Sequence, residues 1–320
     1  MQLPFRLPSQ QDFDAVGFGL NAVDHLIVVA EYPRFDTKVR FRDHQKSAGG
    51  QTATAMVALQ RLGLKTAYAG RFGSDDAGTF GRESLAKEGV NLDYAETVDG
   101  ATNQLAFIVI DARSGERTII WDRDDRLSYR ADEVPIELAS RGRVLHLDAH
   151  DPPACAALAR AARDSGAIIT ADIDNIYEGV QDLLPLIHVL ITSSEFPNRL
   201  TGITDLRTAL IEMKSRYGCP IVGATLGDRG AIAYCEDEFI ESRAFAVPGG
   251  CRDTTGAGDA FHAGFIYAML AEEDVEGCMK TANAVAALKC RELGGRPALP
   301  SANELKQFLS ASRPVGIAGG

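Results

Sequence analysis

Four apolar segments in the second half of the chain, each separated from the next by a helical stretch, restrict the folds that this sequence can adopt. They read RVLHLDA at 143–149, AIITADI at 167–173, HVLITS at 188–193 and PIVGATLG at 220–227. Short, continuously apolar segments of this kind are typical of strands that are covered on both faces. Their alternation with helices predicts a mostly parallel sheet wrapped by helices, which is an α/β fold.

The carboxyl ends of these segments carry polar and turn-forming residues. In a parallel sheet such ends share one edge, where ligands bind. The residues at these ends are Asp148, His150, Asp172, Asp174, Ser193, Glu195, Thr225 and Gly227. His146 and His150 flank Asp148, but they lie i,i+4 on a strand and its end and not on a helix, so this group does not predict a metal site.

The composition is that of a soluble globular protein, with 45% hydrophobic and 24% charged residues in 320, enough for one large domain or two ordinary ones. No apolar run approaches the ~18–20 residues of a membrane span, and residues 1–14 do not resemble a secretory signal, so we expect a cytoplasmic protein. The net charge of −11 disfavours nucleic acid as a partner. The six cysteines lack metal-ligand spacing, which predicts free buried thiols.

Residues 12–30 form an almost wholly apolar segment that predicts an opening strand. Asp24 lies five residues after Gly19, where this strand should leave the sheet. A short, rigid acid at that place can accept two hydrogen bonds from neighbouring sugar hydroxyls. The alternative is an ordinary turn aspartate that is satisfied by its own loop.

Two further segments predict a small β-sheet lid. Residues 31–48 alternate apolar and charged side chains, which favours an exposed strand, and residues 104–121 give two alternating strands around a Ser-Gly turn, a hairpin. With segment boundaries near 31–48 and 101–123, the lid side chains most able to meet a polar substrate are Asn103, Gln104, Arg117, Trp121 and Arg123. Unpaired lid edges invite a second copy of the chain, so we expect a homodimer through the lid.

The stretch DTTGAGDAFHAGF at 253–265 combines small residues with the start of a helix. Gly256, Ala257 and Gly258 leave the backbone N–H groups of the first turn open to an anion, which the helix dipole also favours. Asp259 would stand beside that anion, where it can take a proton from an attacking alcohol. The alternative is a Gly-rich turn that only starts a helix, with Asp259 as a first-turn acid.

These thirteen residues closely resemble the second signature of the PfkB (ribokinase-like) family of carbohydrate and nucleoside kinases. Residues 48–63, AGGQTATAMVALQRLG, resemble the first signature, with Gln51 and Thr54 in place of its usual asparagines. Residues 224–231, ATLGDRGA, match the family's TLGxxG loop. The C-terminal VAALKC and the following Gly294, Gly295 and Arg296 are similar to sulfofructose kinases and ketohexokinases, and the whole resemblance covers about 12–312, leaving a tail at 313–320.

The resemblance implies a ribokinase-like three-layer α/β/α fold and ATP-dependent phosphorylation of a primary hydroxyl of a sugar. Asp259 would be the catalytic base, and the turn 256–258 would hold the charge of the transferring phosphoryl group. The implied acceptor residues are Asp24, Gly49, Gly50, Gln51, Thr54, Asn103, Trp121 and Arg123, and the implied nucleotide residues are Thr225, Gly227, Gly230 and Asn283. ATP and Mg²⁺ are the expected cofactors, with a monovalent cation as a further candidate.

The metal role that the family gives to its NxxE motif would fall near Glu195, which lies one position off the motif and follows no asparagine at its expected place. Two other functions stay open. A nucleoside kinase of the same fold would need an aromatic stacking site for the base, and Phe41, Phe107 and Trp121 leave that possible. A non-catalytic sugar-binding regulatory protein is disfavoured by the intact Asp259.

Overall fold

The computed structural model describes residues 1–113, 115–312 and 314. The expected tail at 313–320 therefore lies outside the described residues, apart from residue 314. Among the described residues no helix has the length and apolar character needed to cross a membrane. All six cysteines are free, and every one except the exposed Cys251 is buried, which confirms the expected free thiols.

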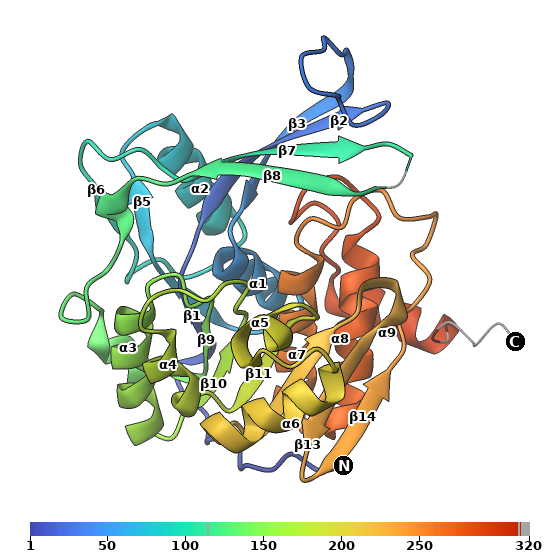
Figure 1. The fold of residues 1–320 in the computed structure, drawn as a ribbon. Coiled ribbons are helices and arrows are strands. Elements are labelled where there is room, and N and C mark those ends of the chain that lie inside the picture. Colours follow the sequence, from blue (N-terminus) through green and yellow to red (C-terminus); the bar gives the residue numbers. More distant parts are fainter. Residues whose placement is uncertain (114, 313, 315–320) are drawn as a thin grey trace, which may run out of the picture.

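The main sheet has eight strands in the order β14-β13-β12-β11-β10-β9-β1-β4 (Figure 1). The parallel strands are β1 (Phe13–Phe18), β4 (Thr66–Ala69), β9 (Gly142–Leu147), β10 (Ile168–Ala171), β11 (Val189–Ser193) and β12 (Ile221–Thr225). An antiparallel hairpin, β13 (Ala231–Cys235) and β14 (Glu238–Ser242), closes one edge. The four apolar segments of the sequence are thus adjacent strands, as the βα alternation predicts.

Helices cover both faces of this sheet, which gives the three expected layers. One hydrophobic core joins the sheet to α1 (Gln51–Arg61), α2 (Asp76–Lys87), α7 (Ala257–Leu270), α8 (Val275–Lys289) and α9 (Ala302–Ala311). The core on the other face joins it to α3 (Pro152–Asp164), α4 (Val180–Leu183), α5 (Phe196–Thr201) and α6 (Leu206–Tyr217). Short 3₁₀ turns occupy Asp125–Leu127, Ile136–Ser140, Leu184–Leu186 and Gly227–Arg229.

A second sheet forms the lid, across one end of the main sheet (Figure 1). Its order is β3-β2-β7-β8, with β2 (Ala22–Val29), β3 (Phe41–Gly49), β7 (Leu105–Asp111) and β8 (Arg117–Asp122). The predicted hairpin at 104–121 is present as β7 and β8. A two-stranded parallel sheet of β5 (Arg71–Gly73) and β6 (Glu96–Val98) lies apart from it.

The structure corrects two strand predictions. The opening segment 12–30 is not one strand, because the chain leaves the main sheet after β1 and enters the lid as β2. The break falls at Leu20, whose N–H donates to the Asp148 carboxylate at 2.5 Å and not to a neighbouring strand. The segment 31–48 is a strand only from Phe41, since the chain before it forms an exposed loop that reaches positive φ at Asp36.

Helices α7 and α8 pack closely because Gly264 faces α8. A Cβ at this position would lie 2.7 Å from the Cα of Ala282 and 3.0 Å from Cγ2 of Val285. Because the nearest atom belongs to the backbone, a side chain at position 264 would require the two helices to move apart. Glycine at position 264 therefore permits the close approach of α7 and α8.

We expect Gly264→Ala to lower the free energy of unfolding by about 1–3 kcal/mol, the usual cost of overpacking. Gly81→Ala in α2 is the matched control, because its Cβ would meet Phe72 at an ordinary 3.5 Å. The control should be neutral, or stabilising by up to about 1 kcal/mol through helix propensity. Urea unfolding of both variants measures the difference, and equal stabilities would contradict the close-packing argument.

Candidate active site

A cavity of about 640 Å³ lies between the lid and the carboxyl ends of the main-sheet strands. Its walls come from lid strands, from the ends of β9 to β12, and from the turn before α7. Among the residues implied by the sequence, those that line it are Asp24, Gly49, Gly50, Gln51, Thr54, Trp121, Thr225, Gly227, Gly256, Ala257, Gly258 and Asp259. Segments more than two hundred residues apart in the chain thus share one cavity.

The turn before α7 has the backbone shape that an anion site needs. Gly256 is the N-cap residue in the left-handed conformation, with φ 76°, and no side chain caps the helix. The N–H of Ala257 donates to the carbonyl of Thr254 and that of Ala260 to the carbonyl of Gly256. Gly258 and Asp259, which lie between them in the first turn and line the cavity, have N–H groups that precede the regular hydrogen bonds of the helix. A Cβ on Gly256 would lie 2.7 Å from the Cα of Gly295, so this backbone contact requires glycine at position 256.

Asp259 lies in the first turn of α7 and lines the cavity. Withdrawal from water and the nearby carboxylates of Asp172 and Asp24 raise its pKa well above the ordinary value. A raised pKa makes the ionised carboxylate a stronger base. The environment of Asp259 therefore suits the removal of a proton from an alcohol.

Asp24 reaches the same cavity from lid strand β2. It is only 6% exposed, and no group of the described residues hydrogen-bonds its carboxylate, which leaves the oxygens available to a ligand. Burial raises the pKa of Asp24 to about 6, although the positive charge of Arg296 opposes the rise. A Cβ on Gly49 would lie 2.1 Å from its Oδ2, so the glycine leaves the space that Asp24 fills.

Arg296 is a functional residue that sequence reasoning missed, although it was part of the quoted C-terminal resemblance. Its guanidinium is buried behind the cavity and donates to the carbonyl of Gly49 at 2.6 Å, to Oγ1 of Thr54 at 3.4 Å and to Oγ of Ser84 at 3.2 Å. Burial lowers its pKa to about 10. It stabilises the Gly-Gly turn before α1 and places a positive charge near Asp24.

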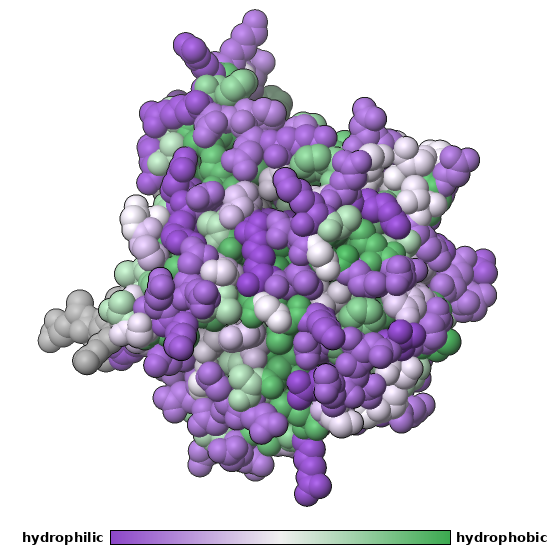
Figure 2. All heavy atoms as spheres, turned by 180° about the vertical axis from the view of Figure 1, so that it is seen from behind, coloured by the Kyte–Doolittle hydropathy of each residue, from purple (hydrophilic) through white to green (hydrophobic). Residues whose placement is uncertain are grey.

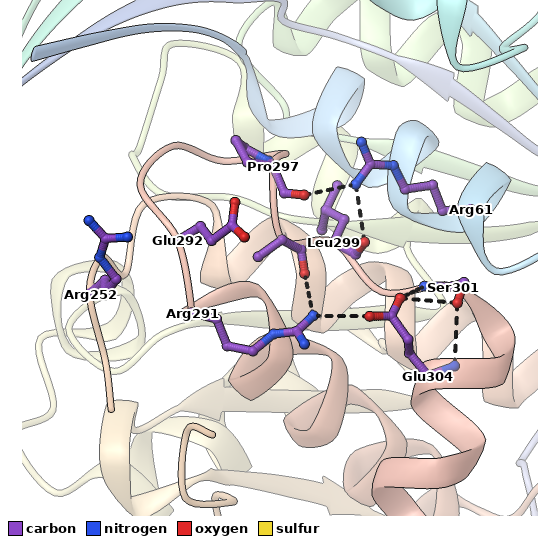
Figure 3. Close-up of a pocket in the computed structure, with 9 residues that line it drawn as sticks. Arg61, Arg252, Arg291, Glu292, Pro297, Leu299, Ser301 and Glu304 are labelled. Carbon is purple, nitrogen blue, oxygen red and sulfur yellow. Dashed lines mark hydrogen bonds and ion pairs between the residues drawn. The ribbon is translucent and has the colours of Figure 1, made fainter. Parts of the chain in front are cut away.

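Arg296 is carried by the loop after α8, and two other arginines fix that loop (Figure 3). Arg61 from α1 donates to the carbonyls of Arg296, Pro297 and Leu299. Arg291 donates to the carbonyl of Ala298 and contacts Glu304 of α9. A cavity of about 570 Å³ lies beside these arginines. The guanidinium groups of Arg61 and Arg291 already have protein acceptors, so we assign them to anchoring the loop and not to binding a ligand.

A second missed group surrounds Asp172 at the end of β10. Nε2 of His262, on α7 one turn after Asp259, lies 3.4 Å from Oδ1 of Asp172, and the ring of His146 lies 5.5 Å from that of His262. Gln51 also hydrogen-bonds to Asp172. Although burial raises the pKa of Asp172, the His262 imidazole and these hydrogen bonds bring it below the ordinary value. Asp172 therefore stays ionised beside Asp259.

Five implied site residues do not line the cavity. Asn103 is buried and accepts a hydrogen bond from the N–H of Gly73, and Arg123 donates to Oγ of Ser128 and the carbonyl of Leu127. Asn283 donates to the carbonyl of Ser242, Gly230 makes the turn between β12 and β13, and Glu195 is exposed at the start of α5. In this structure the first four of these residues stabilise the fold around the site.

The lid touches the catalytic turn directly. Arg117 of β8 lines the cavity and donates a hydrogen bond to Oγ1 of Thr254, two residues before Gly256. Trp121, further along β8, is 52% exposed, and its ring meets that of His150 edge-on at 6.0 Å. The lid therefore contributes both a cation and an aromatic surface to the cavity.

An open glycine turn and two carboxylates that are unpaired within the described part of the chain share one cavity, an arrangement that suits phosphoryl transfer. We compared the chain with known proteins. A model of the pfkB family of carbohydrate kinases matches residues 15–302. The chain is 26% identical over 312 residues to a nucleoside kinase of Methanothermobacter thermautotrophicus, covering 94% of this chain and 97% of that protein. It is 28% identical over 328 residues to Fructokinase-1 of Zea mays, covering 92% and 97%.

The fold comparison points the same way. The structure of Arabidopsis thaliana ribokinase complexed with ribose and ATP superposes with a TM-score of 0.78 at 23% identity, covering 92% of this chain and 98% of that one. The chain belongs to the pfkB family of carbohydrate kinases and has the ribokinase-like fold. It is an ATP-dependent kinase that acts on a sugar or a nucleoside.

The negative charge of Asp172 raises the pKa of Asp259, and this coupling can be used to test whether Asp259 is the catalytic base. Because Asp259 must be ionised to act, kcat/KM should fall with decreasing pH at a pKa well above the ordinary 3.8. Asp172→Asn removes a like charge, so the pKa of Asp259 should fall and the acid limb should move to lower pH. Asp174→Asn is the control, since Asp174 also lines the cavity but is not among the groups that shift Asp259. An unmoved limb in Asp172→Asn would contradict this coupling.

Proposed function

We propose that this kinase transfers the γ-phosphoryl group of ATP to a primary hydroxyl of a sugar. One observation supports this most strongly: Asp24 and Asp259, from opposite ends of the chain, line a single cavity next to an open glycine turn. Their carboxylates have no hydrogen-bond donor among the described residues, so both are available to hydroxyl groups of a bound acceptor.

In the proposed reaction Asp24 accepts hydrogen bonds from two neighbouring hydroxyls and fixes the orientation of the sugar. Asp259 removes the proton of the attacking hydroxyl, and the N–H groups after Gly256 stabilise the charge that develops on the transferring phosphoryl group. Thr225 and Gly227 lie along the nucleotide side of the cavity. The reaction requires the attacking hydroxyl and the leaving oxygen to lie roughly in line on either side of the transferring phosphoryl group.

Mg²⁺ would be held mainly by the nucleotide phosphates. No group of three or more His, Cys, Asp or Glu side chains with metal-binding geometry occurs among the described residues. The carboxylates that line the cavity fit Mg²⁺, because this ion commonly takes only one or two carboxylates from the protein and keeps water and phosphate oxygens as its other ligands. When bound, the ion would neutralise charge on the phosphates. A metal role for Glu195 stays a prediction.

The charges around the cavity favour a neutral acceptor. Four carboxylates line it, those of Asp24, Asp172, Asp174 and Asp259, whereas Arg117 is the lining cation in the described part of the chain. An acceptor with its own phosphate or carboxylate would be repelled by these carboxylates. Ketoses and other neutral sugars, which present donors to carboxylates, fit best.

A nucleoside is the second candidate, because Trp121 and Tyr177 both line the cavity and offer ring surfaces to a base. The relationship to a nucleoside kinase also supports it. Nucleotide turnover with a panel of ketoses, aldoses, sugar acids and nucleosides separates the two. Selective turnover with nucleosides would refute the sugar proposal, and absence of turnover with every acceptor would favour a binding protein.

We also infer a homodimer formed through the lid. Large apolar side chains are exposed on the lid and its loop, among them Phe35, Phe41, Phe107 and Ile120. Elsewhere hydrophilic residues dominate, as the reverse view shows for that face (Figure 2). Strands β3 and β8 are both open edges. Dimerisation and a cytoplasmic location stay predictions.

Asp259→Asn keeps the shape of the side chain but removes the base. We expect kcat to fall at least about a hundredfold, the usual size of a general-base contribution, with unchanged ATP affinity. Steady-state kinetics and nucleotide titration measure the two effects. Near-normal turnover would remove Asp259 from the mechanism.

Asp24→Asn should weaken acceptor binding while it stabilises the protein at neutral pH. Loss of charge-assisted hydrogen bonds corresponds to roughly 2–4 kcal/mol, so the acceptor KM should rise at least about 30-fold with little change for ATP. Since the folded pKa of Asp24 is raised to about 6, ionisation costs stability as pH rises from 3.8 to that value.

The raised pKa of Asp24 also predicts how the free energy of unfolding changes with pH. The wild type should lose about 2 kcal/mol relative to Asp24→Asn between pH 4.5 and pH 7.5. Urea unfolding at the two pH values measures it. If the variant has a normal acceptor KM and lower stability at both values, Asp24 is a structural aspartate.

A further inference from the structure

Lys289, the last residue of α8, is completely buried. Its Nζ donates to the backbone carbonyl of Asp253 at 2.9 Å and lies 3.9 Å from Oδ2 of the same residue. Asp253 is also inaccessible to solvent. Lysine is almost never fully buried, because its ammonium group loses hydration and its long stem usually lets it reach water.

The burial of Lys289 has a measurable cost. Loss of hydration lowers the pKa of Lys289, although the neighbouring Asp253 carboxylate raises it. A hydrophobic side chain of similar size would avoid this cost, so a buried ion pair is weak support for stability alone. The contact of the ammonium group with Asp253, three residues before Gly256, points to another role.

Asp253 is the first residue of the DTTGAGD turn, and it ties that turn to the end of α8. Its carboxylate accepts hydrogen bonds from the N–H of Thr255 at 2.8 Å and of Gly294 at 2.8 Å. The preceding residue, Arg252, donates its N–H to the carbonyl of Cys290 at 2.9 Å. Gly256, three residues after Asp253, packs closely against the backbone of Gly295. The backbone that forms the anion site is thus anchored at Asp253.

The ammonium group fills a space lined by oxygen. The carbonyl oxygen of Asp253 lies 2.9 Å from Nζ and a carboxylate oxygen of the same residue 3.9 Å from it, while the positive charge of Arg117 acts on the ammonium group from the lid. Oxygen ligands of this kind suit a small cation, and here the cation is covalently attached to the chain. No exchangeable ion is required at this position to hold the turn.

We propose that Lys289 is a positioning residue whose ammonium group acts as a built-in cation beneath the anion-binding turn, and that it makes turnover independent of added monovalent cations. The proposal rests on the kinase activity described above. Lys289 acts through Asp253 and the backbone of residues 253–258, and it touches neither substrate. Its loss should therefore lower kcat more than it changes the acceptor KM.

The test compares turnover in KCl, NH4Cl, NaCl and choline chloride at equal ionic strength. The wild type should turn over equally in all four salts. Lys289→Ala, which leaves a space for an ion, should lose at least about 30-fold in kcat in choline chloride, because displacement of reacting groups by about 1 Å costs on the order of a hundredfold. K⁺ or NH₄⁺ should restore most of this activity.

Two variants serve as controls. Lys289→Met fills the space without a charge, so its loss should not be recovered by any salt. Lys280→Ala removes an exposed lysine from the same helix and should behave as the wild type. Thermal unfolding of each variant distinguishes misplacement of the turn from loss of the fold.

Three outcomes would overturn the proposal: wild-type activation by K⁺ of more than about threefold over choline, full activity of Lys289→Ala in choline, or a folded Lys289→Ala that no cation restores. The wild-type salt series decides the matter even if the variants do not fold. If the wild type phosphorylates no acceptor in any salt, the proposed function fails, and that result is distinct from cation dependence of an active enzyme.

Discussion

Repulsion among carboxylates is the constraint on which the rest of this site depends. Asp24, Asp172 and Asp259 line one cavity, and the negative charges of Asp24 and Asp172 oppose the ionisation of Asp259. Positively charged side chains outside the cavity lining partly offset this repulsion. Lys289 and Arg296 both lower the pKa of Asp259, and His262 keeps Asp172 ionised. The side facing the substrate stays acidic, while the positive charges are buried among backbone carbonyls.

The two acids that would hold and activate the acceptor belong to different parts of the fold. Asp24 is on a lid strand, whereas Asp259 is on a helix packed against the main sheet. Their separation depends on the junction between these parts. Arg296 crosses that junction, because it comes from the C-terminal loop and donates to Gly49 at the end of lid strand β3. The arginine thus joins the C-terminal loop to the Gly-Gly turn that lines the cavity.

The sequence predicts those features that are encoded locally. The βα alternation after residue 143 and the turn at 253–265 both need only neighbouring residues, and both are present as expected. The division of 12–30 between two sheets was missed, because a continuous apolar segment does not show where it changes sheets. Arg296 and Lys289 were missed as site residues for another reason: their partners are far away in the sequence. Asn103 and Arg123 were predicted to meet the substrate, but their side chains hydrogen-bond to protein groups and do not line the cavity.

Cys251 has a practical consequence for the study of this enzyme. It is exposed and lies just before Asp253, while the other five thiols are buried. A thiol-reactive fluorophore should therefore attach at one place, in the loop that leads into the turn before α7. The fluorescence of such a label would respond to a change in the surroundings of this loop. Ligand occupancy could then be followed in real time without coupling to a second enzyme.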